Sequence, residues 1–306
     1  MDPDAILLLL VLAGAPGRTS VPAPVVAPRV AQAEPAPRPR APAEHAGVSV
    51  ALEVRRDRFD CRFENPSSFN TADLVPHIVE QRHDVDNAWL VARVRFNAGG
   101  RLWETEAGVT PAATGLGSDY DTFFQPDGNV IVYGTTAETD LRSWRFAQYV
   151  GLGSWRGTRL RAGYSYRNDR SGYRPSYSTT TQTKPPSTSS VWNTDRETTI
   201  AEVHEVRLGA ARALVHAQRW RVEATADVAP TTLARLSTLL PDKYDAPVVF
   251  IAKGLSLEAQ LRIATRARRV DAGASIDYVH SWSYGQKNQF HRSGLGASVH
   301  LGLNWD

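Results

Sequence analysis

The sequence predicts an all-β chain, a closed antiparallel up-and-down transmembrane β-barrel of about ten strands. Apolar residues recur at every second position through most of the chain after Gly47, which is the period of a strand with one apolar face. Short glycine- or arginine-bearing turns alternate with long polar segments, as in barrels of the bacterial outer membrane. No stretch after residue 20 holds the roughly 18 uncharged apolar residues that a membrane-spanning helix requires.

The N-terminal region predicts export. The apolar run Ile6–Ala13 has the length of a signal-peptide core and is too short to span a bilayer, and Ala31-Gln32-Ala33 suits a signal peptidase. Acidic residues precede the run, where a signal peptide normally carries Lys or Arg. We therefore expect a signal peptide and cleavage region over residues 1–33, a proline-rich tether over 34–46 and the barrel over 47–306.

Several segments alternate between apolar and polar residues. In the clearest one, the even positions from Leu160 to Tyr166 are apolar and the odd positions between Arg159 and Arg167 are polar or glycine. The same alternation occurs in Val48–Val54, Trp220–Val228, Leu255–Ile263 and Ser298–Trp305. The last of these places an aromatic residue almost at the C-terminus, which is typical of outer-membrane barrels, although Asp306 follows it.

The connections between these segments alternate in length. Short turns are expected at Ala98–Gly100, Ser154–Gly157, Ala217–Arg219 and Thr265–Ala267. Long polar loops are expected at Thr114–Ala137, Ser171–Arg196, Thr231–Pro247 and Gly285–Ser293. Short turns at one rim and long loops at the other predict a periplasmic and an extracellular end, with both termini at the periplasmic rim.

Two architectures fit the alternation, and the aromatic residues favour the membrane barrel. Lipid offers no hydrogen-bond partner, so a sheet in lipid must close on itself. The alternative is a soluble β-sandwich or lipocalin-like barrel, which buries its apolar face inside. That fold would have to hide in one core the residues Trp103, Trp144, Tyr164, Tyr166, Trp220 and Trp305. Aromatic residues near strand ends are more typical of girdles at the membrane surface.

If the apolar face contacts lipid, the interior of the barrel is charged. Arg93 and Arg95 run along one strand, and Glu104 and Glu106 run along the next one across the Gly99-Gly100 turn. Opposite charges at cross-strand distance pair and brace the interior. Filled with such side chains, a barrel of about ten strands is too narrow to leave an open channel.

Composition excludes several function classes. The formal net charge is +3 and the basic residues are scattered, so we expect no nucleic-acid partner. The single cysteine, Cys61, forbids an internal disulfide and lacks the paired spacing of a metal site. We expect no cofactor and no metal ion.

Two carboxylates stand out at the outer end of a strand. Asp119 and Asp121 follow a glycine-rich segment and are separated by one residue, so in extended backbone both point the same way. Such a pair can share a proton, hold a water molecule as a general base, or bind a cation. An Asp-x-Asp in a loop is also a common solvated turn, so the pair alone has low specificity.

From about Gly47 to Trp305 the chain resembles the omptin family of outer-membrane endoproteases, which are barrels that cleave peptides beside basic residues. The segments that carry the resemblance are Asp86–Phe96, Leu102–Thr110, the glycine-rich segment with Asp119 and Asp121, Thr139–Leu141 and Ala162–Tyr164. The resemblance implies that Asp119 and Asp121 form one side of the catalytic cleft. It also implies lipopolysaccharide and outer-membrane lipid as partners and a peptide as substrate at the extracellular mouth.

The second side of an omptin cleft is an Asp-x-His pair, and here the sequence departs from the family. The corresponding segment, Thr231–Pro247, contains no histidine, and Asp242, Lys243 and Tyr244 stand where the pair belongs. A protonated lysine cannot act as a general base. We take Asp242 and Tyr244 as candidates for this side of the cleft, with solvated loop residues as the alternative.

A histidine from another strand could replace the missing one. His204 and His280 are the candidates in the outer halves of neighbouring strands, and both also fit as ordinary strand residues.

Three functions remain open from the sequence. The first is an omptin-like peptidase that uses Asp119 and Asp121. The second is a barrel without catalysis that acts in binding, adhesion or structure at the bacterial surface. The third is a barrel that hydrolyses lipid, for which no serine and histidine occur at a recognisable spacing.

Overall fold

The computed structural model describes residues 46–64, 76–194, 197–217, 220–239, 247–267, 269–285 and 287–305. The expected signal peptide over 1–33 and all but the last residue of the expected tether over 34–46 lie outside these ranges. No helix in the described part of the chain is long and apolar enough to span a bilayer. The described residues form twelve strands, which are β1 (Ala46–Glu64), β2 (His77–Ala98), β3 (Arg101–Phe124), β4 (Val130–Trp155), β5 (Thr158–Tyr173), β6 (Ser176–Thr183), β7 (Pro186–Asn193), β8 (Thr198–His216), β9 (Trp220–Leu239), β10 (Val248–Ala267), β11 (Val270–Ser283) and β12 (Asn288–Trp305).

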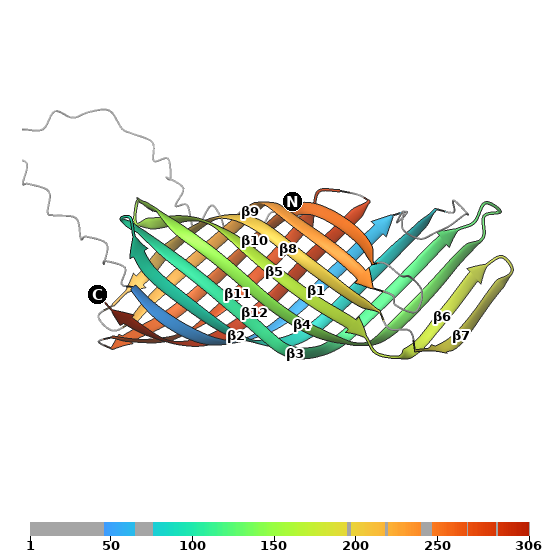
Figure 1. Cartoon of the computed structure of the whole chain (residues 1–306), viewed down its shortest axis with the longest axis horizontal. Helices are drawn as coiled ribbons and strands as arrows, with labels where there is room; N and C mark the ends of the chain where they lie inside the picture. Colours follow the sequence, from blue (N-terminus) through green and yellow to red (C-terminus); the bar gives the residue numbers. More distant parts are fainter. Residues whose placement is uncertain are drawn as a thin grey trace, which may run out of the picture. The chain divides into compact units, whose positions relative to one another are not determined.

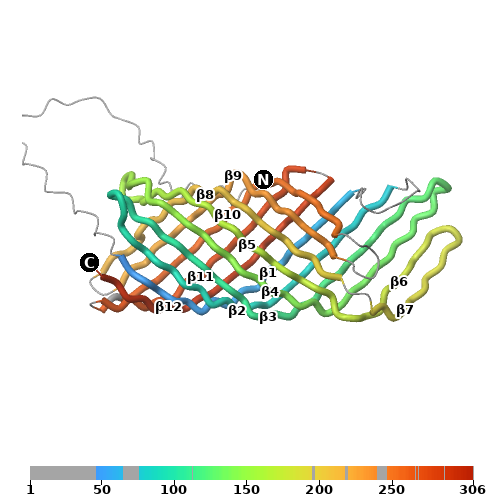
Figure 2. The backbone as a smooth tube through the Cα atoms, in the orientation of Figure 1, coloured from blue at the N-terminus to red at the C-terminus, as the bar shows by residue number. Residues whose placement is uncertain are grey.

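Ten of these strands close into an antiparallel barrel (Figure 1). The ring runs β1, β2, β3, β4, β5, β8, β9, β10, β11, β12, and β12 pairs with β1 so that Trp305 lies opposite Ala46. The fold class and strand number predicted from the sequence are thus confirmed. β6 and β7 form a hairpin outside the ring, in which Ser178–Gln182 pairs with Ile131–Thr135 of β4 (Figure 2).

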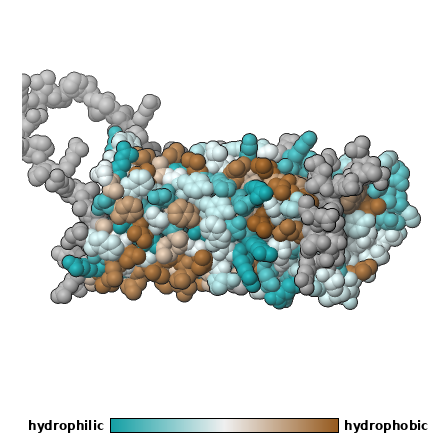
Figure 3. Space-filling model, viewed as in Figure 1, coloured by the Kyte–Doolittle hydropathy of each residue, from teal (hydrophilic) through white to brown (hydrophobic). Residues whose placement is uncertain are grey.

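The outward side chains form an apolar belt around one part of the barrel. Exposed members on three adjacent strands are Val50, Leu52 and Val54 of β1, Leu90, Val94 and Phe96 of β2, and Leu295, Val299, Leu301 and Leu303 of β12. In Figure 3, apolar side chains cover much of the part where β12 ends, and polar ones dominate the end that carries β6 and β7. Leu160 and Leu301 face outward, so the apolar stripe of the strands contacts the surroundings and is not packed in a core.

Outward charges on six strands of the barrel, which we call the charged collar, end the belt. Its members lie beside one another on paired strands and are Arg56 beside Asp86, Arg142 beside Arg170, and Glu202 beside Arg235. Charged side chains on the lipid face of a barrel are costly. The belt therefore spans the membrane, and the strand segments beyond the collar, which we call the outer extension, stand in water.

The interior changes character at the same level. In β1 the inward residues within the belt are Glu53, Arg55 and Asp57, whereas the outer extension continues with Phe59, Cys61 and Phe63. The inside of the spanning part is a network of ion pairs. It includes the expected cross-strand pairs Arg93–Glu106 and Arg95–Glu104, each with an N–O distance of 2.5 Å. The charged interior predicted from the sequence is confirmed.

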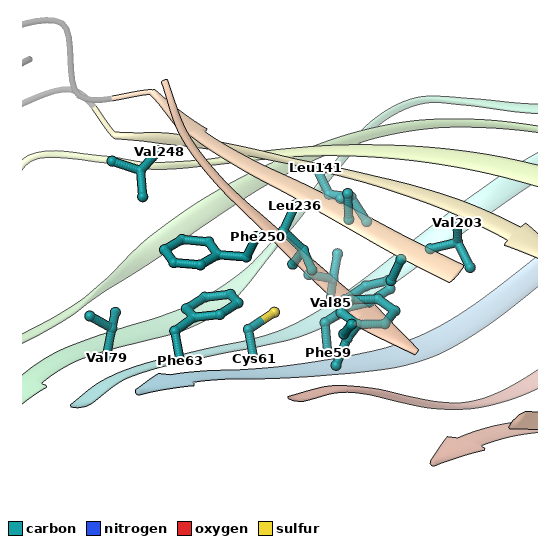
Figure 4. Close-up of a cluster of buried hydrophobic side chains, with 14 of the residues drawn as sticks. Phe59, Cys61, Phe63, Val79, Val85, Leu141, Val203, Leu236, Val248 and Phe250 are labelled. Atoms are coloured by element: carbon teal, nitrogen blue, oxygen red, sulfur yellow. The ribbon is translucent and has the colours of Figure 1, made fainter. Parts of the chain in front are cut away.

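The outer extension has an apolar core of its own. Phe63 stacks on Phe250 of β10 with ring centroids 3.8 Å apart, and Leu141, Val85 and Leu236 are almost fully buried beside them (Figure 4). The full cluster also contains Phe59, Cys61, Val79, Ala113, Ala201, Val203, Ala234, Val248, Ala252 and Phe290. In water a sheet must bury its apolar face, and here it buries that face inside the barrel.

The prediction of long loops is wrong for most of these segments, because they form strands of the outer extension or of the β6–β7 hairpin. β3 continues to Phe124 and β4 starts at Val130, so Thr114–Ala137 is mainly strand, and β9 continues to Leu239. The segment Ser171–Arg196 contains the β6–β7 hairpin. At the opposite rim the expected short turns are close to their predicted places, although β10 extends through Thr265–Ala267 and ends only at Ala267.

Candidate functional site

Asp119 and Asp121 lie on β3 in the outer extension. A bulge in the β3–β4 pairing between Thr110 and Ala113 changes the phase of the strand, so that the odd-numbered residues above it face inward. Both carboxylates consequently line a recess of about 370 Å³ at the outer end of the barrel. The prediction that the two side chains share one face is confirmed, but the pair lies on a strand and not in a loop.

The recess, which we call the acidic recess, is lined by residues of nine strands, β1–β7, β9 and β10, and by Arg174 and Glu197 from the segments between strands. Its walls are rich in aromatic rings, namely Phe63, Phe123, Tyr133, Tyr173 and Phe250. Its polar lining consists of Gln81, Asp119, Asp121, Thr135, Arg174, Ser176, Ser178, Asn193, Glu197 and Thr238. The guanidinium of Arg174 is engaged by Glu138 and Asp140 at 2.7 and 2.9 Å, which leaves the acidic side chains to set the charge of the recess.

Glu197, just before β8, brings a third carboxylate to the recess. The Nε2 of Gln81 donates a hydrogen bond to its Oε1 at 2.6 Å. The orientation of the Gln81 amide is fixed from the other side, because the hydroxyl of Thr199 donates to the Oε1 of Gln81 at 3.3 Å. A carboxylate that accepts a hydrogen bond from a fixed amide is favoured in its ionised form.

Asp119 is a strongly perturbed acid of the recess. Burial, followed by the negative charges of Glu197 and Asp121, raises its pKa well above the ordinary value of 3.8. It is in hydrogen-bond contact with Gln81 and Glu197, and its Oδ1 is buried without a hydrogen-bond partner among the described residues. The arrangement therefore places a carboxyl whose pKa is raised beside a carboxyl that accepts a hydrogen bond from Gln81, and such unequal environments separate the acid from the base in a catalytic acid pair.

An imidazole that the sequence analysis did not identify lies below the recess. His83 of β2 is buried, its ring stacks on Tyr173 with centroids 5.0 Å apart, and its Nε2 is 3.3 Å from the Tyr173 hydroxyl. That hydroxyl donates to the backbone oxygen of Ser118 at 3.0 Å, which fixes Tyr173 beside Asp119. Burial lowers the pKa of His83 to about 4, so the ring is neutral at neutral pH. The only signal for His83 in the sequence was its position among the alternate residues of β2 that face inward.

The two histidines proposed as replacements face away from the recess. The Nδ1 of His204 is 2.6 Å from the hydroxyl of Tyr164, and its ring lies against Tyr166. His280 lies between Tyr278 and Trp282 on β11. Both positions belong to the outward face of their strands, so His204 and His280 are ordinary strand residues, the reading that the sequence favoured, and neither completes the cleft.

The candidate second side of the cleft, Asp242 and Tyr244 with Lys243 between them, lies outside the described residues. Thr238 and Val248, close to the ends of β9 and β10, both line the acidic recess. Assignment of Asp242 and Tyr244 to the cleft stays a prediction. Within the described ranges, no three His, Cys, Asp or Glu side chains are grouped as ligands for a metal ion.

Comparison with known proteins adds information on the fold. No family model matches the sequence, and no curated protein does. The crystal structure of the outer-membrane protease OmpT from Escherichia coli superposes with a TM-score of 0.62 at 7% identity, covering 87% of this chain and 100% of that one. The translocator domain of the autotransporter NalP from Neisseria meningitidis superposes with a TM-score of only 0.32 at 10% identity, covering 85% of this chain and 89% of that one. The attachment invasion locus protein Ail of Yersinia pestis gives a TM-score of 0.23 at 8% identity, covering 84% of this chain and 99% of that one.

The similarity to OmpT establishes an omptin-like barrel architecture, because the two chains match over most of their lengths in three dimensions. Together with the apolar belt, this fold places the chain in the bacterial outer membrane. At 7% identity the similarity concerns the fold and does not assign an activity.

Proposed function

We propose that this protein is a surface peptidase of the outer membrane that hydrolyses peptides in the acidic recess with a pair of carboxyl groups. The observation that carries the proposal is the convergence of Asp119, Asp121 and Glu197, from two different parts of the barrel, on one recess at its outer end. The omptin-like architecture supports it, because the sequence resemblance implies a cleft at Asp119 and Asp121. No imidazole belongs to the described lining of the recess, so the chemistry falls to the acids.

The proposed roles make Asp119, whose pKa is raised, the acid and Glu197 the base. The Glu197 carboxylate removes a proton from a water molecule as the water oxygen attacks the carbonyl carbon, and the Asp119 carboxyl donates its proton to the carbonyl oxygen. The resulting gem-diol collapses when Glu197 passes its proton to the amide nitrogen and the C–N bond breaks. Asp119 then recovers a proton from the diol hydroxyl, which returns both groups to their starting states and releases an acid and an amine.

Asp121 and the aromatic walls have a binding role in this scheme. A negative charge among the rings of Phe123, Tyr133 and Tyr173 suits a lysine or arginine side chain, because the carboxylate pairs with the cation and the rings cover its apolar stem. The preference for a basic residue agrees with what the omptin resemblance implies. The formal charge of the substrate side chain is thus complementary to that of the recess.

The test compares turnover of a fluorogenic peptide with two adjacent basic residues, using full-length protein refolded with lipopolysaccharide. We expect Asp119→Asn and Glu197→Gln each to lower kcat by about 100-fold or more, since general acid–base catalysis contributes that much. Glu80→Gln is the matched control, because Glu80 is the neighbour of Gln81 on β2 but faces outward. Turnover that survives in both recess variants would remove the acid pair from the mechanism.

The pH profile gives an independent check. Activity requires Glu197 ionised and Asp119 protonated, so the rate should fall at low pH as Glu197 takes up a proton and at high pH as Asp119 loses one. Because the pKa of Asp119 is raised, the alkaline fall lies well above the ordinary range of an aspartic acid. A rate that rises steadily to alkaline pH contradicts the assigned roles.

A second function is binding of a cationic peptide without turnover. The aromatic walls favour it because they cover the apolar stem of a basic side chain, and the described lining lacks the imidazole that an omptin cleft uses as its base. A wild-type protein that binds the basic peptide and never cleaves it would establish this alternative.

A further inference from the structure

The β6–β7 hairpin offers a strand edge outside the ring of the barrel. In the described residues β7 pairs only with β6, and all its residues except Asn193 are exposed. The tip is held in place at the start of β4. There the Oδ1 of Asn129 accepts hydrogen bonds from the backbone N–H groups of Thr183 and Lys184 at 3.1 and 2.8 Å. The edge is therefore fixed to the barrel wall.

The free edge lacks the features that protect exposed strands. Such strands commonly carry charged side chains, proline within the strand or a bulge, which prevent another chain from adding to the sheet. From Ser187 to Asn193, β7 has no charge and no proline, and its register with β6 is unbroken. Its residues are mostly Ser and Thr with Val191 and Trp192. The backbone of this segment is thus available for pairing.

The hydrogen bond from Asn129 also reveals which backbone groups are available. The N–H of Thr183 points toward Asn129, away from β7, so Thr183 and Pro186 form a pair without mutual hydrogen bonds. In an antiparallel ladder the two kinds of pair alternate. The pairs of Thr188, Ser190 and Trp192 are of the same kind as that of Pro186. The N–H and C=O groups of these three residues consequently point to the free edge.

The edge leads directly to the acidic recess. Asn193 at the end of β7 lines the recess together with Ser176 and Ser178 of β6, and the Nδ2 of Asn193 donates to the Ser178 hydroxyl at 3.1 Å. Just above them, Tyr177 and Trp192 form an exposed edge-to-face pair with centroids 5.0 Å apart. A chain lying along β7 would meet first the aromatic pair and then the carboxylates.

We propose that β7 is a docking edge for an extended peptide segment, which adds to the sheet as one more strand and delivers a basic side chain to the acidic recess. The proposal rests on the proposed function for the identity of the occupant. At about 3.3 Å per residue, Ser187–Trp192 pairs with a segment of about six residues. Backbone pairing binds many sequences, while the recess selects the charged residue. The complementary charges of recess and side chain set the register of the bound strand.

The experiment removes one outward N–H and nothing else of the edge. Ser190→Pro deletes the donor on the free side, where an edge strand tolerates proline. Ser190→Ala is the matched control, because it keeps the N–H and removes the same hydroxyl, which lies 3.2 Å from the Thr179 hydroxyl. Binding is measured by fluorescence anisotropy with two probes: a labelled peptide of about ten residues with a basic residue near one end, and a labelled dibasic dipeptide that fills the recess only.

We expect Ser190→Pro to weaken binding of the long peptide by about tenfold, as the loss of a hydrogen bond of this type does. Binding of the dipeptide should be unchanged, and Ser190→Ala should bind both probes like the wild type. Two peptides are compared, one methylated at the backbone nitrogens of its odd-numbered residues and one at those of its even-numbered residues. Only one of these two sets of N–H groups faces β7, so only one of the two peptides should bind more weakly. Unchanged binding of the long peptide by Ser190→Pro, or equal losses in the proline and alanine variants, overturns the proposal.

Measuring both turnover and peptide binding, in Ser190→Pro and in Glu197→Gln, separates this inference from the proposed function. If the peptidase proposal fails, no protein turns over substrate, yet the proline variant still tests the docking edge by binding alone. If the docking edge fails, turnover of the dibasic substrate persists while the proline variant binds the long peptide normally.

Discussion

A charged residue placed on the outward face should be tolerated in the outer extension and costly in the apolar belt. Leu301 of β12 and Leu116 of β3 form a matched pair, because both are outward leucines with exposed fractions of 61% and 63%. Leu301 lies between Val50 and Ala272 on the neighbouring strands, well inside the belt. Leu116 lies beside Asp84 and Glu138, beyond the charged collar.

The expected magnitudes follow from the two surroundings. Leu301→Arg puts a guanidinium against hydrocarbon and should lower the free energy of unfolding by about 2–4 kcal/mol, the usual cost near the middle of the bilayer. Leu116→Arg puts the same group in water beside two carboxylates and should change it by less than about 0.5 kcal/mol. Reversible guanidinium unfolding in phospholipid vesicles, followed by tryptophan fluorescence, measures both. Similar effects of the two substitutions would refute the assignment of belt and extension.

Three further predictions concern the outer extension. Leu236→Ala should destabilise the protein by about 2–5 kcal/mol because Leu236 is fully buried in the apolar core, whereas Leu233→Ala on the outward face of the same strand should cost far less in the same unfolding assay. His83 has its pKa lowered to about 4, so the folded state loses about 3 kcal/mol of stability as pH falls from about 6.5 to 4; urea midpoints of His83→Gln should lack this loss. Asp119 has a raised pKa, so its own contribution to stability is fully present below the ordinary value of 3.8 and declines as pH rises from there through the raised pKa. Asp119→Asn should remove the decline and be more stable than wild type at alkaline pH, and an unchanged pH dependence would contradict the burial of a protonated Asp119.

The acidic recess divides into residues that the sequence could identify and residues that it could not. Asp119 and Asp121 were predictable, because two residues of the same kind with one residue between them share a face of any strand. Glu197 and His83 carry no such local signal. Glu197 reaches the recess because β8 begins opposite the outer end of β2, a relation that depends on the closure of the barrel.

The hairpin and the outer extension were missed for a related reason. Segments with many Ser, Thr, Gly and Pro residues favour loops locally, and Ser171–Arg196 has that composition. These segments become strands because they continue strands that are already paired, and because the extension buries its own apolar residues inside the barrel. Neither the pairing with existing strands nor the burial inside the barrel can be predicted from local composition.

The sequence by itself determined that the chain is a barrel in a membrane, because a period of two and an apolar face are properties of neighbouring residues along one strand. It also determined the charged interior of the spanning part, since inward and outward positions alternate. Only the tertiary structure decided which carboxylates meet, where the sheet leaves the lipid and which strand edge stays open. Those features arise from pairing between residues far apart in the chain, and the register of that pairing is set by closure of the whole ring.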